Sequence, residues 1–436
     1  MIPVTVSWLV IQNQKRSIAM KSIKTEKIKT INEKTLVVAL DIGKKVHYGY
    51  FRTPKNQDVK PFPFYNSGRS FNKFWKKLCR FKEKHMLGEV VIGFESTGPY
   101  AEPIANYLRR KPVKLVQVNP MHTKRIKELT GNSPNKTDKK DPRVIADVIS
   151  LGHSLTVVVP EGAAAQLRRL THARERAMER RTAMNNQLQD LVFVIFPELG
   201  DIIKPSTKTG MYLIKHYPDS ESIVSIGFET LCNIVRKISR GKFGIDRVEK
   251  LYNAAKESVG ITEGKESILL ETSHLVSNIE TENRYIESLE GQMIVYLDQI
   301  PYSHSILSIK GIGNITAAGL IGEVGDFRKF KTISEVMKLA GLDLFEVSSG
   351  KHKGKHRISK RGRALIRKLL FFAAINTVKS HGIMHAKYQK MLNNGTPKIK
   401  ALIAISRKLF RIIFALARDN TKYVENYKSH EFKLAA

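Results

Sequence analysis

The sequence predicts an α/β domain over residues 35–160, a long helical part over 163–300 and a mainly helical C-terminal domain over 301–420. Short β-branched runs alternate with helical periods in the first part, and long helical periods follow in the second. Short helices broken by glycines make up the third. A length of 436 residues suits two or three domains, and a hydrophobic content of 42% is ample for packed cores. Residues 1–34 are expected to be a basic N-terminal extension, in which Met20 is a second candidate start.

The α/β prediction starts from two paired strands. Leu36–Leu40 is a β-branched run, and aromatic alternation resumes over His47–Arg52 after the turn at Gly43, which indicates two antiparallel strands. The further elements expected in this domain are helices over 71–84, 100–110 and 141–151 and strands over 89–94 and 113–118.

The middle part contains two long helical stretches. Ala163–Phe196 is a helix that Pro197 ends, and it carries arginines at positions 168, 169, 174, 176, 180 and 181. Glu249–Leu297 has apolar positions spaced by three, four and seven residues, which suits an amphipathic or coiled-coil face. Two interpretations stay open for this stretch: a helical arm that packs on itself, or the seam of a dimer.

The C-terminal part begins with a glycine turn between helices. Ile309-Lys-Gly-Ile-Gly313 precedes a helical run over 316–323, and a second helix follows over 334–339, the pattern of a helix-hairpin-helix. Such a turn directs backbone amides and a helix N-terminus at a DNA phosphate. Lys310, Gly311 and Gly313 are therefore candidate nucleic-acid contacts.

The charge of the chain indicates a polyanionic partner. Lys and Arg total 74 against 40 Asp and Glu, a net charge of +34, which favours nucleic acid over a membrane surface because no long apolar span is present. Candidate contacts are a dense C-terminal series and two arginines of the first long helix, for which a solvated helix face is the alternative: Lys351, Lys353, Lys355, Arg357, Lys360, Arg361, Arg363, Arg168 and Arg169. The two cysteines, Cys79 and Cys232, have no metal-ligand spacing, and with no signal peptide the chain is expected in a reduced cytoplasm.

Four acidic residues form a candidate metal site. Asp41 ends the first strand, where an RNase H-like fold has its first metal ligand, and Glu95 ends a later strand of the same sheet. Asp138 and Asp141 are three residues apart and would share one face at a helix start. These hard oxygen ligands suit two Mg²⁺ or Mn²⁺ ions, which stabilise attacking and leaving oxygens in phosphoryl transfer.

Each acid also has a structural interpretation. Asp41 before Gly43 could be a turn residue, Glu95 a solvated loop acid and Asp138 a helix N-cap, while Asp141 precedes a proline that suits a first helical turn. Leu40-Asp-Ile-Gly43 also fits the phosphate loop of actin-like sugar kinases, but two lysines follow where small hydroxyl residues are expected, and no adenosine loop is evident.

Three segments with these acids, Val37–Lys45, Gly93–Gly98 and Asn135–Asp141, resemble the acidic motifs of the DEDD transposases of the insertion-sequence-110 and insertion-sequence-1111 family, which includes the Piv invertases. Further resemblance lies at 311–313, 330–332, 339–342, 349–350 and 358–362, so it extends in order over about residues 35–420. Two departures are Ile42-Gly43 where the family has valine-serine, and Pro142 where it has alanine; Pro142 favours an extended Asp141.

The resemblance implies a RuvC-like catalytic domain with Asp41, Glu95, Asp138 and Asp141 as metal ligands, a coiled-coil connector and a C-terminal transposase domain with a catalytic serine. Ser349 is the first candidate for that serine and Ser348 the second. A serine hydroxyl can hold a phosphodiester as a covalent intermediate. The family implies DNA as substrate, a structured non-coding guide RNA, dimers that assemble into a tetramer, and a bacterial, nucleoid-associated protein.

Three functions stay open from the sequence. The first is a recombinase that cuts and rejoins DNA through a serine-linked intermediate. The second is a RuvC-like nuclease that resolves Holliday junctions by water attack and needs the acids but no serine. The third is a non-catalytic helix-hairpin-helix DNA-binding protein.

Overall fold

The computed structural model describes residues 31–95, 98–130, 141–152, 154–156, 160–346, 354 and 356–425, and of residues 130, 141 and 154–156 only the backbone. The chain divides into two compact units, residues 1–158 and 159–436. The second unit contains both the predicted connector and the predicted C-terminal domain.

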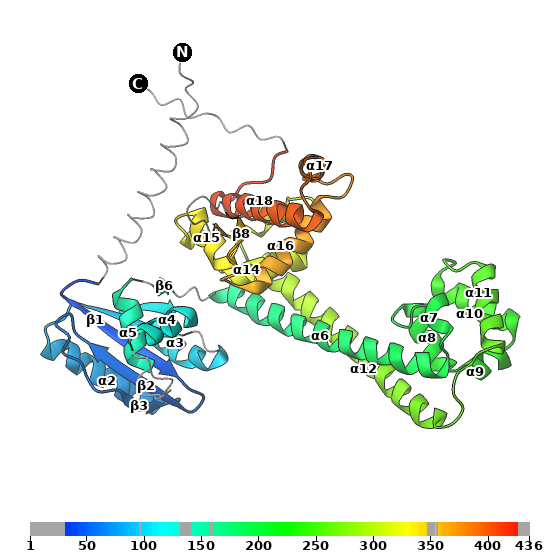
Figure 1. Ribbon diagram of the computed structural model, residues 1–436, viewed down its shortest axis with the longest axis horizontal. Helices are drawn as coiled ribbons and strands as arrows, with labels where there is room; N and C mark the ends of the chain where they lie inside the picture. Colours follow the sequence, from blue (N-terminus) through cyan, green and yellow to red (C-terminus); the bar gives the residue numbers. More distant parts are fainter. Residues whose placement is uncertain are drawn as a thin grey trace, which may run out of the picture. The chain divides into compact units, whose positions relative to one another are not determined.

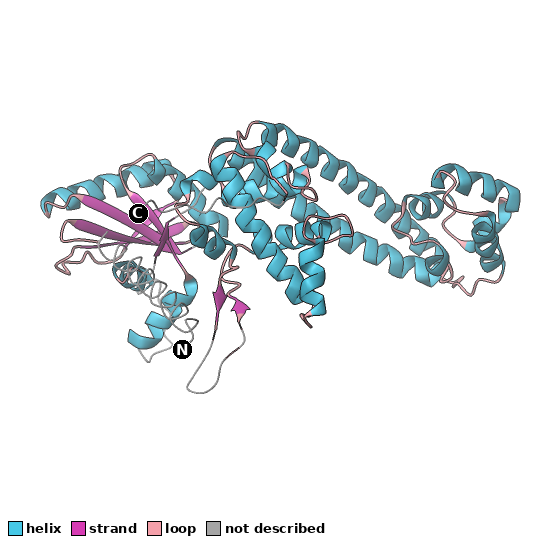
Figure 2. Cartoon of the chain, turned by 90° about the horizontal axis from the view of Figure 1, so that it is seen from above, coloured by secondary structure: helices cyan, strands magenta, loops and turns pink. Residues whose placement is uncertain are grey.

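The first unit is built on a six-stranded mixed sheet (Figure 1; Figure 2). Its strands are β1 (Thr35–Ile42), β2 (Val46–Arg52), β3 (Phe62–Tyr65), β4 (Glu89–Glu95), β5 (Lys114–Val118) and β6 (Ser154–Thr156), in the order β3-β2-β1-β4-β5-β6. The strands β1, β4 and β5 are parallel, while β2, β3 and β6 run antiparallel to their neighbours. The four predicted strands are confirmed. The strands β3 and β6 were not predicted from the sequence.

Helices cover both faces of this sheet because its strands alternate apolar side chains between two cores. Helices α2 (Gly68–Lys84) and α3 (Glu102–Arg109) pack on the face that carries Leu40 and Phe94. Helix α5 (Asp141–Ser150) packs on the opposite face, which carries Ala39 and Val91. Helix α4 (Pro120–Thr130), which was not predicted, contacts α5, and a short 3₁₀ turn, η1 (Gly98–Ala101), leads into α3.

The second unit contains a two-helix arm made of α6 (Gly162–Ile195) and α12 (Lys265–Asp298) (Figure 1). Pairs such as Arg174 with Glu290 and Gln187 with Glu271 show that the two helices are antiparallel. The arm therefore packs on itself, one of the two interpretations left open by the sequence. The prediction of one helical stretch over Glu249–Leu297 was wrong, because α11 (Ile245–Lys256) ends before Gly264 and α12 starts after it.

Two helical bodies flank the arm. Helices α7 (Leu199–Ile202), α8 (Lys208–His216), α9 (Ser220–Ser225), α10 (Phe228–Ser239) and α11 share a core with the adjoining ends of α6 and α12. The other body holds α13 (Ser303–Leu307), α14 (Asn314–Val324), η2 (Phe327–Lys329), α15 (Ile333–Ala340), α16 (Ala364–Thr377), α17 (His385–Asn393) and α18 (Lys398–Asp419), with a small hairpin of β7 (Leu344–Phe345) and β8 (Arg357–Ile358). Among the described residues, no helix is both long and apolar enough to cross a membrane.

Candidate active site and nucleic-acid surfaces

The first two predicted metal ligands lie on adjacent parallel strands. Leu40 of β1 pairs with Phe94 of β4, so the register places Asp41 beside Glu95 one residue further. Odd-numbered positions of both strands face α5, as Ala39 and Val91 show. Both acids are half-buried at the ends of their strands. The structure therefore brings these two carboxylates to one face and one edge of the sheet, as the sequence predicts.

The direction of α5 brings its N-terminus to the same edge. Arg143 lies 5.9 Å above the ring of Tyr50 in β2, and Asp147, one turn later in α5, forms an ion pair with Arg52, two residues further along β2. Because β2 is antiparallel to β1, α5 runs from the carboxyl end of β1 toward its beginning. The backbone of Asp141, the first residue of α5, therefore lies toward the end of the sheet that carries the two acids.

A hydroxyl group holds the second acid. Thr123 of α4 is buried, and its Oγ1 donates a hydrogen bond to Oε1 of Glu95. The same oxygen also lies 2.9 Å from the carbonyl oxygen of Pro120. Thr123 was missed in the sequence, although Asn119-Pro120 is a helix-start signal and the Asn119 side chain accepts from the amide of Met121 at 2.9 Å. We assign Thr123 as a positioning residue for Glu95.

The remaining predicted ligands are described only in part. Asp138 lies outside the described residues, and so does the side chain of Asp141. Within the part of the chain that the structure describes, no group of three or more His, Cys, Asp or Glu side chains has a metal-binding arrangement. Asp41 and Glu95 thus place two carboxylates side by side, and a metal-binding role stays a prediction for all four acids.

The predicted serine belongs to the segment between β7 and β8. Ser348, Ser349, Lys351, Lys353 and Lys355 lie outside the described residues. The two strands that flank this segment pair through Leu344 with Ile358 and Phe345 with Arg357.

Two glycines close the base of this hairpin. A Cβ atom on Gly362 would lie 2.3 Å from the amide nitrogen of Gly341, which itself has a φ of +65°. The backbones of segments 339–342 and 359–363 are therefore in direct contact, and Arg367 donates from Nη1 to the carbonyl of Ala340 at 2.8 Å. This contact joins two of the segments singled out in the sequence.

A buried acid lies where the C-terminal body packs against α6. Glu323 of α14 is 1% exposed, with Oε1 lying 2.8 Å from Nε2 of His172 and 3.5 Å from Nη1 of Arg168 on α6. Arg363, just before α16, donates to the backbone carbonyl of Glu323. Burial acts to raise the pKa of Glu323, but His172 and the two arginines outweigh it and lower that pKa. Burial and the charge of Arg168 lower the pKa of Arg363 to about 10.

The predicted nucleic-acid contacts that the structure describes separate into two groups. Arg168 and Arg363 have a partner within the protein, Glu323, so the structure gives them a role in packing α6, α14 and the start of α16 together. The exposed group consists of Lys310, Gly311, Gly313, Arg357, Lys360, Arg361 and Arg169. In the turn before α14, the exposed positions alternate with Ile309 and Ile312, which are buried.

Much of the arginine-rich face of α6 contacts α12. Nε of Arg174 lies 2.6 Å from Glu290, Arg180 binds both carboxylate oxygens of Glu282 at 2.8 and 3.0 Å, and Arg181 donates to Asn283. These arginines therefore stabilise the arm. The sequence did not indicate this, since their partners are about a hundred residues away.

Two family models match the chain. A model of DEDD transposases of the IS110 type, described as "Transposase", matches residues 38–197. A second, described as "Transposase IS116/IS110/IS902 family", matches residues 303–389. The chain belongs to the IS110 family of transposases. The first match includes all four predicted acids of the transposase, and the second includes the glycine turn and Ser349.

Proteins of other insertion elements are similar to the transposase. It is 23% identical over 390 residues to a 43.6 kDa protein of insertion element IS110 from Streptomyces coelicolor, which covers 88% of this chain and 95% of that protein. It is 23% identical over 287 residues to a 44.8 kDa protein of IS116 from Streptomyces clavuligerus, covering 65% and 71% of the two chains. It is 26% identical over 172 residues to the transposase of IS1111A from Coxiella burnetii, covering 39% and 46%.

Proposed function

We propose that the transposase cuts and rejoins DNA at a two-metal carboxylate site on an RNase H-like, RuvC-like domain. The observation that carries this proposal is the position of Asp41 beside Glu95 at one edge of the sheet, with the N-terminus of α5 directed to the same edge. Asp138 and Asp141 would complete the ligand set. The strand order, with three parallel strands flanked by antiparallel β2 and β3, supports the RNase H-like assignment.

The chemistry of these residues fits Mg²⁺ or Mn²⁺. Asp41 and Glu95 offer only carboxylate oxygens, and neither a thiol nor an imidazole is among the four proposed ligands. Bound there, two such ions would offset the charge that develops on the attacking and leaving oxygens of a phosphodiester. Thr123 donates to one oxygen of Glu95 and so directs the other oxygen of that carboxylate.

The proposed nucleophile is Ser349, with Ser348 as the alternative. The serine oxygen forms a bond to phosphorus, the bond from phosphorus to a deoxyribose oxygen breaks, and the serine proton is lost while the leaving oxygen gains one. Attack by the hydroxyl of a second strand then reverses these changes, which restores the serine and joins the new strands. One phosphodiester is exchanged for another, so the reaction needs no oxidant or nucleotide.

The remaining proposals concern partners. The exposed residues Lys310, Gly311 and Gly313, with α14 starting at Asn314, would bind a DNA phosphate as a helix-hairpin-helix does. A structured non-coding RNA would guide the protein, whose basic surface reads backbone and shape while base pairing reads sequence. We further propose that dimers assemble into a tetramer on DNA, and that the protein acts at the bacterial nucleoid.

A covalent trap tests this function. Labelled DNA that carries the ends of the mobile element is incubated in Mg²⁺ with the wild-type protein, with Asp41→Asn or with Ser349→Ala. After denaturation, protein–DNA adducts are separated from free DNA. Wild type should form a protein–DNA adduct, and each variant should lose it. Cleavage by wild type without an adduct would indicate a junction nuclease instead. If adducts form in Ser349→Ala and also in Ser348→Ala, the serine assignment is wrong.

A further inference from the structure

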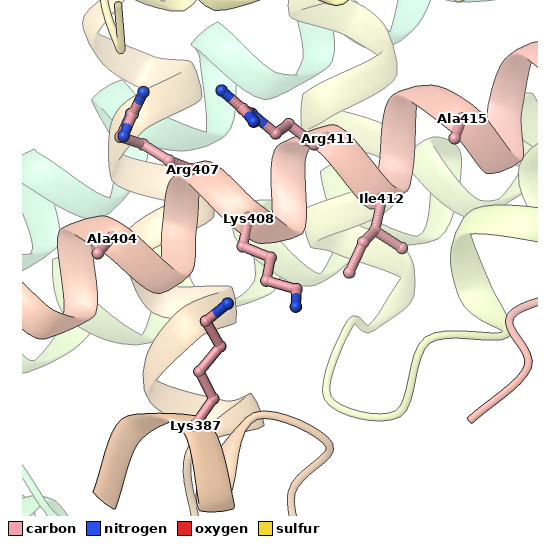
Figure 3. Close-up of a pocket in the computed structure, with 7 residues that line it drawn as sticks. All are labelled: Lys387, Ala404, Arg407, Lys408, Arg411, Ile412 and Ala415. Carbon is pink, nitrogen blue, oxygen red and sulfur yellow. The ribbon is translucent and has the colours of Figure 1, made fainter. Parts of the chain in front are cut away.

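A basic groove lies between α17 and α18, and none of its lining residues is among the nucleic-acid contacts predicted from the sequence (Figure 3). Its volume is about 500 Å³, and four of its lining residues are cations: Lys387 of α17 and Arg407, Lys408 and Arg411 of α18. In Figure 3, Lys387 reaches from α17 toward Lys408, while Arg407 and Arg411 extend from successive turns of α18.

The helical period of α18 explains this arrangement. Positions 404, 407, 408, 411, 412 and 415 form one stripe, and the opposite stripe is apolar and buried through Ile405, Leu409 and Ile413. Two alanines, Ala404 and Ala415, line the groove on either side of the cations. Small residues in these places leave room for a large ligand to reach the charged side chains.

The sequence around these four cations contains no acidic residue. Residues 347–418 contain eighteen lysines and arginines and neither Asp nor Glu, although they are about a sixth of the chain. Eighteen charges are more than half of the net charge of +34. The groove therefore lies in the segment with the greatest excess of positive charge.

These cations repel one another in two pairs, Lys387 with Lys408 and Arg407 with Arg411. The neighbouring ammonium of Lys408 lowers the pKa of Lys387, and partial burial adds to this. Burial lowers the pKa of Arg407, and the charge of Arg411 lowers it further, while Asp343 opposes that effect. Arg407 is held in place because its Nε donates to the carbonyl of Leu342 at 2.8 Å. Like charges fixed this close are destabilising, and an anion between them removes the cost.

We propose that this groove, formed by Lys387, Arg407, Lys408 and Arg411, binds the phosphate backbone of double-stranded DNA. Three of the four side chains are exposed, and successive cations on one helix face can follow a row of phosphates. A transposase acts on DNA, so DNA is the polyanion that a protein of this family must bind. The contact carries no base-edge readout, so it binds all DNA sequences alike.

The inference rests on DNA as the substrate and not on the proposed serine or metal ligands. Variants of the four acids or of Ser349 should lose catalysis but bind DNA as wild type does. Failure of the proposed catalytic function is therefore seen in cleavage, and failure of the proposed groove is seen in DNA binding.

The test uses the full chain with two matched triple variants. One is Lys387→Gln, Lys408→Gln and Arg411→Gln, which leaves the anchored Arg407 in place. The other is Lys237→Gln, Lys242→Gln and Lys250→Gln, three exposed lysines of α10, α11 and the turn between them. Both lower the net charge by three. Binding of a DNA duplex is measured over a series of salt concentrations, with a structured RNA of equal length as a parallel arm.

The groove variant should bind DNA roughly ten- to a hundredfold more weakly, and the slope of log K against log salt should fall by about 3. The loss should be the same for duplexes of unrelated sequence. The control should keep the wild-type slope. If both triple variants lose the same DNA affinity, the loss reflects net charge and not the groove. If the groove variant binds DNA unchanged but RNA more weakly, the groove binds RNA. Either result overturns the proposal.

Discussion

Replacement of Glu323 by Gln should destabilise the second unit of the transposase. The carboxylate is buried and accepts from His172 Nε2 at 2.8 Å, with Arg168 Nη1 3.5 Å away. Each hydrogen bond to a charged group contributes about 1.5–3 kcal/mol. The side chains of Arg168 and His172 are 30% and 41% exposed, so solvent screens both interactions. We therefore expect a loss of roughly 2–3 kcal/mol in the free energy of unfolding.

Two probes separate the two units in a urea titration of the full chain. The second unit contains no tryptophan, whereas Trp75 lies in α2 of the first unit, so a fluorescence change of Trp75 reports on the first unit. Far-UV circular dichroism is dominated by the helices of the second unit. The variant should lower the stability by circular dichroism and leave the tryptophan transition unchanged. Glu287→Gln, an exposed acid on α12 with the same change of charge, is the matched control.

The pH dependence gives a second check on the same residue. Since the pKa of Glu323 is lowered in the folded state, its stabilisation is present above the unfolded value of 4.5 and is lost as the pH falls through the folded value. Glu323→Gln should lack this part of the acid dependence. If its stability lies within about 0.5 kcal/mol of wild type and of the control, the reasoning is refuted.

Three further results are expected. Thr123→Val should reduce DNA cleavage about tenfold or more and leave DNA binding unchanged, because the variant keeps the volume but no longer holds Glu95; unchanged cleavage would remove the positioning role. Burial lowers the pKa of His47, so the first unit should lose stability as the pH falls below the unfolded pKa of 6.5. The variant His47→Leu should lose less stability in urea titrations followed by tryptophan fluorescence between pH 7 and 5. The same pH dependence in the variant and the wild type would contradict this prediction. Gly93→Val should destabilise the first unit by roughly 1–3 kcal/mol and impair cleavage, since a Cβ atom there meets Ile149 of α5 at 2.4 Å; wild-type stability and cleavage would show that α5 can shift freely.

The two strands that carry Asp41 and Glu95 could be predicted from the sequence. The β-branched runs that became β1 and β4 end at Asp41 and Glu95, and parallel pairing then makes the two acids neighbours. The strands β3 and β6, with four and three residues, are too short to leave a periodic pattern. The hydrogen bond from Thr123 to Glu95 is a tertiary contact over 28 positions that no local pattern contains.

The middle of the chain shows where periodicity misleads. Apolar spacing continues across the end of α11, yet a Cβ atom on Gly260 would lie 1.9 Å from the carbonyl oxygen of Ile195. The chain must therefore pass close to the end of α6, which breaks the helix. The partners of the α6 arginines could not be predicted either. The sequence identifies the cations but does not show whether each one binds a phosphate or a distant glutamate such as Glu290.

Metal-dependent cleavage by single and double variants of Asp41 and Glu95 tests the central proposal most directly. Labelled DNA with the ends of the element is incubated with wild type, Asp41→Asn, Glu95→Gln and the double variant, in Mg²⁺, in Mn²⁺ and in a chelator. Each single variant should abolish cleavage while DNA binding stays as in wild type, and the double variant should be no worse, because both residues would serve one site. Cleavage by Asp41→Asn at the wild-type rate, or cleavage in the chelator, would contradict the account.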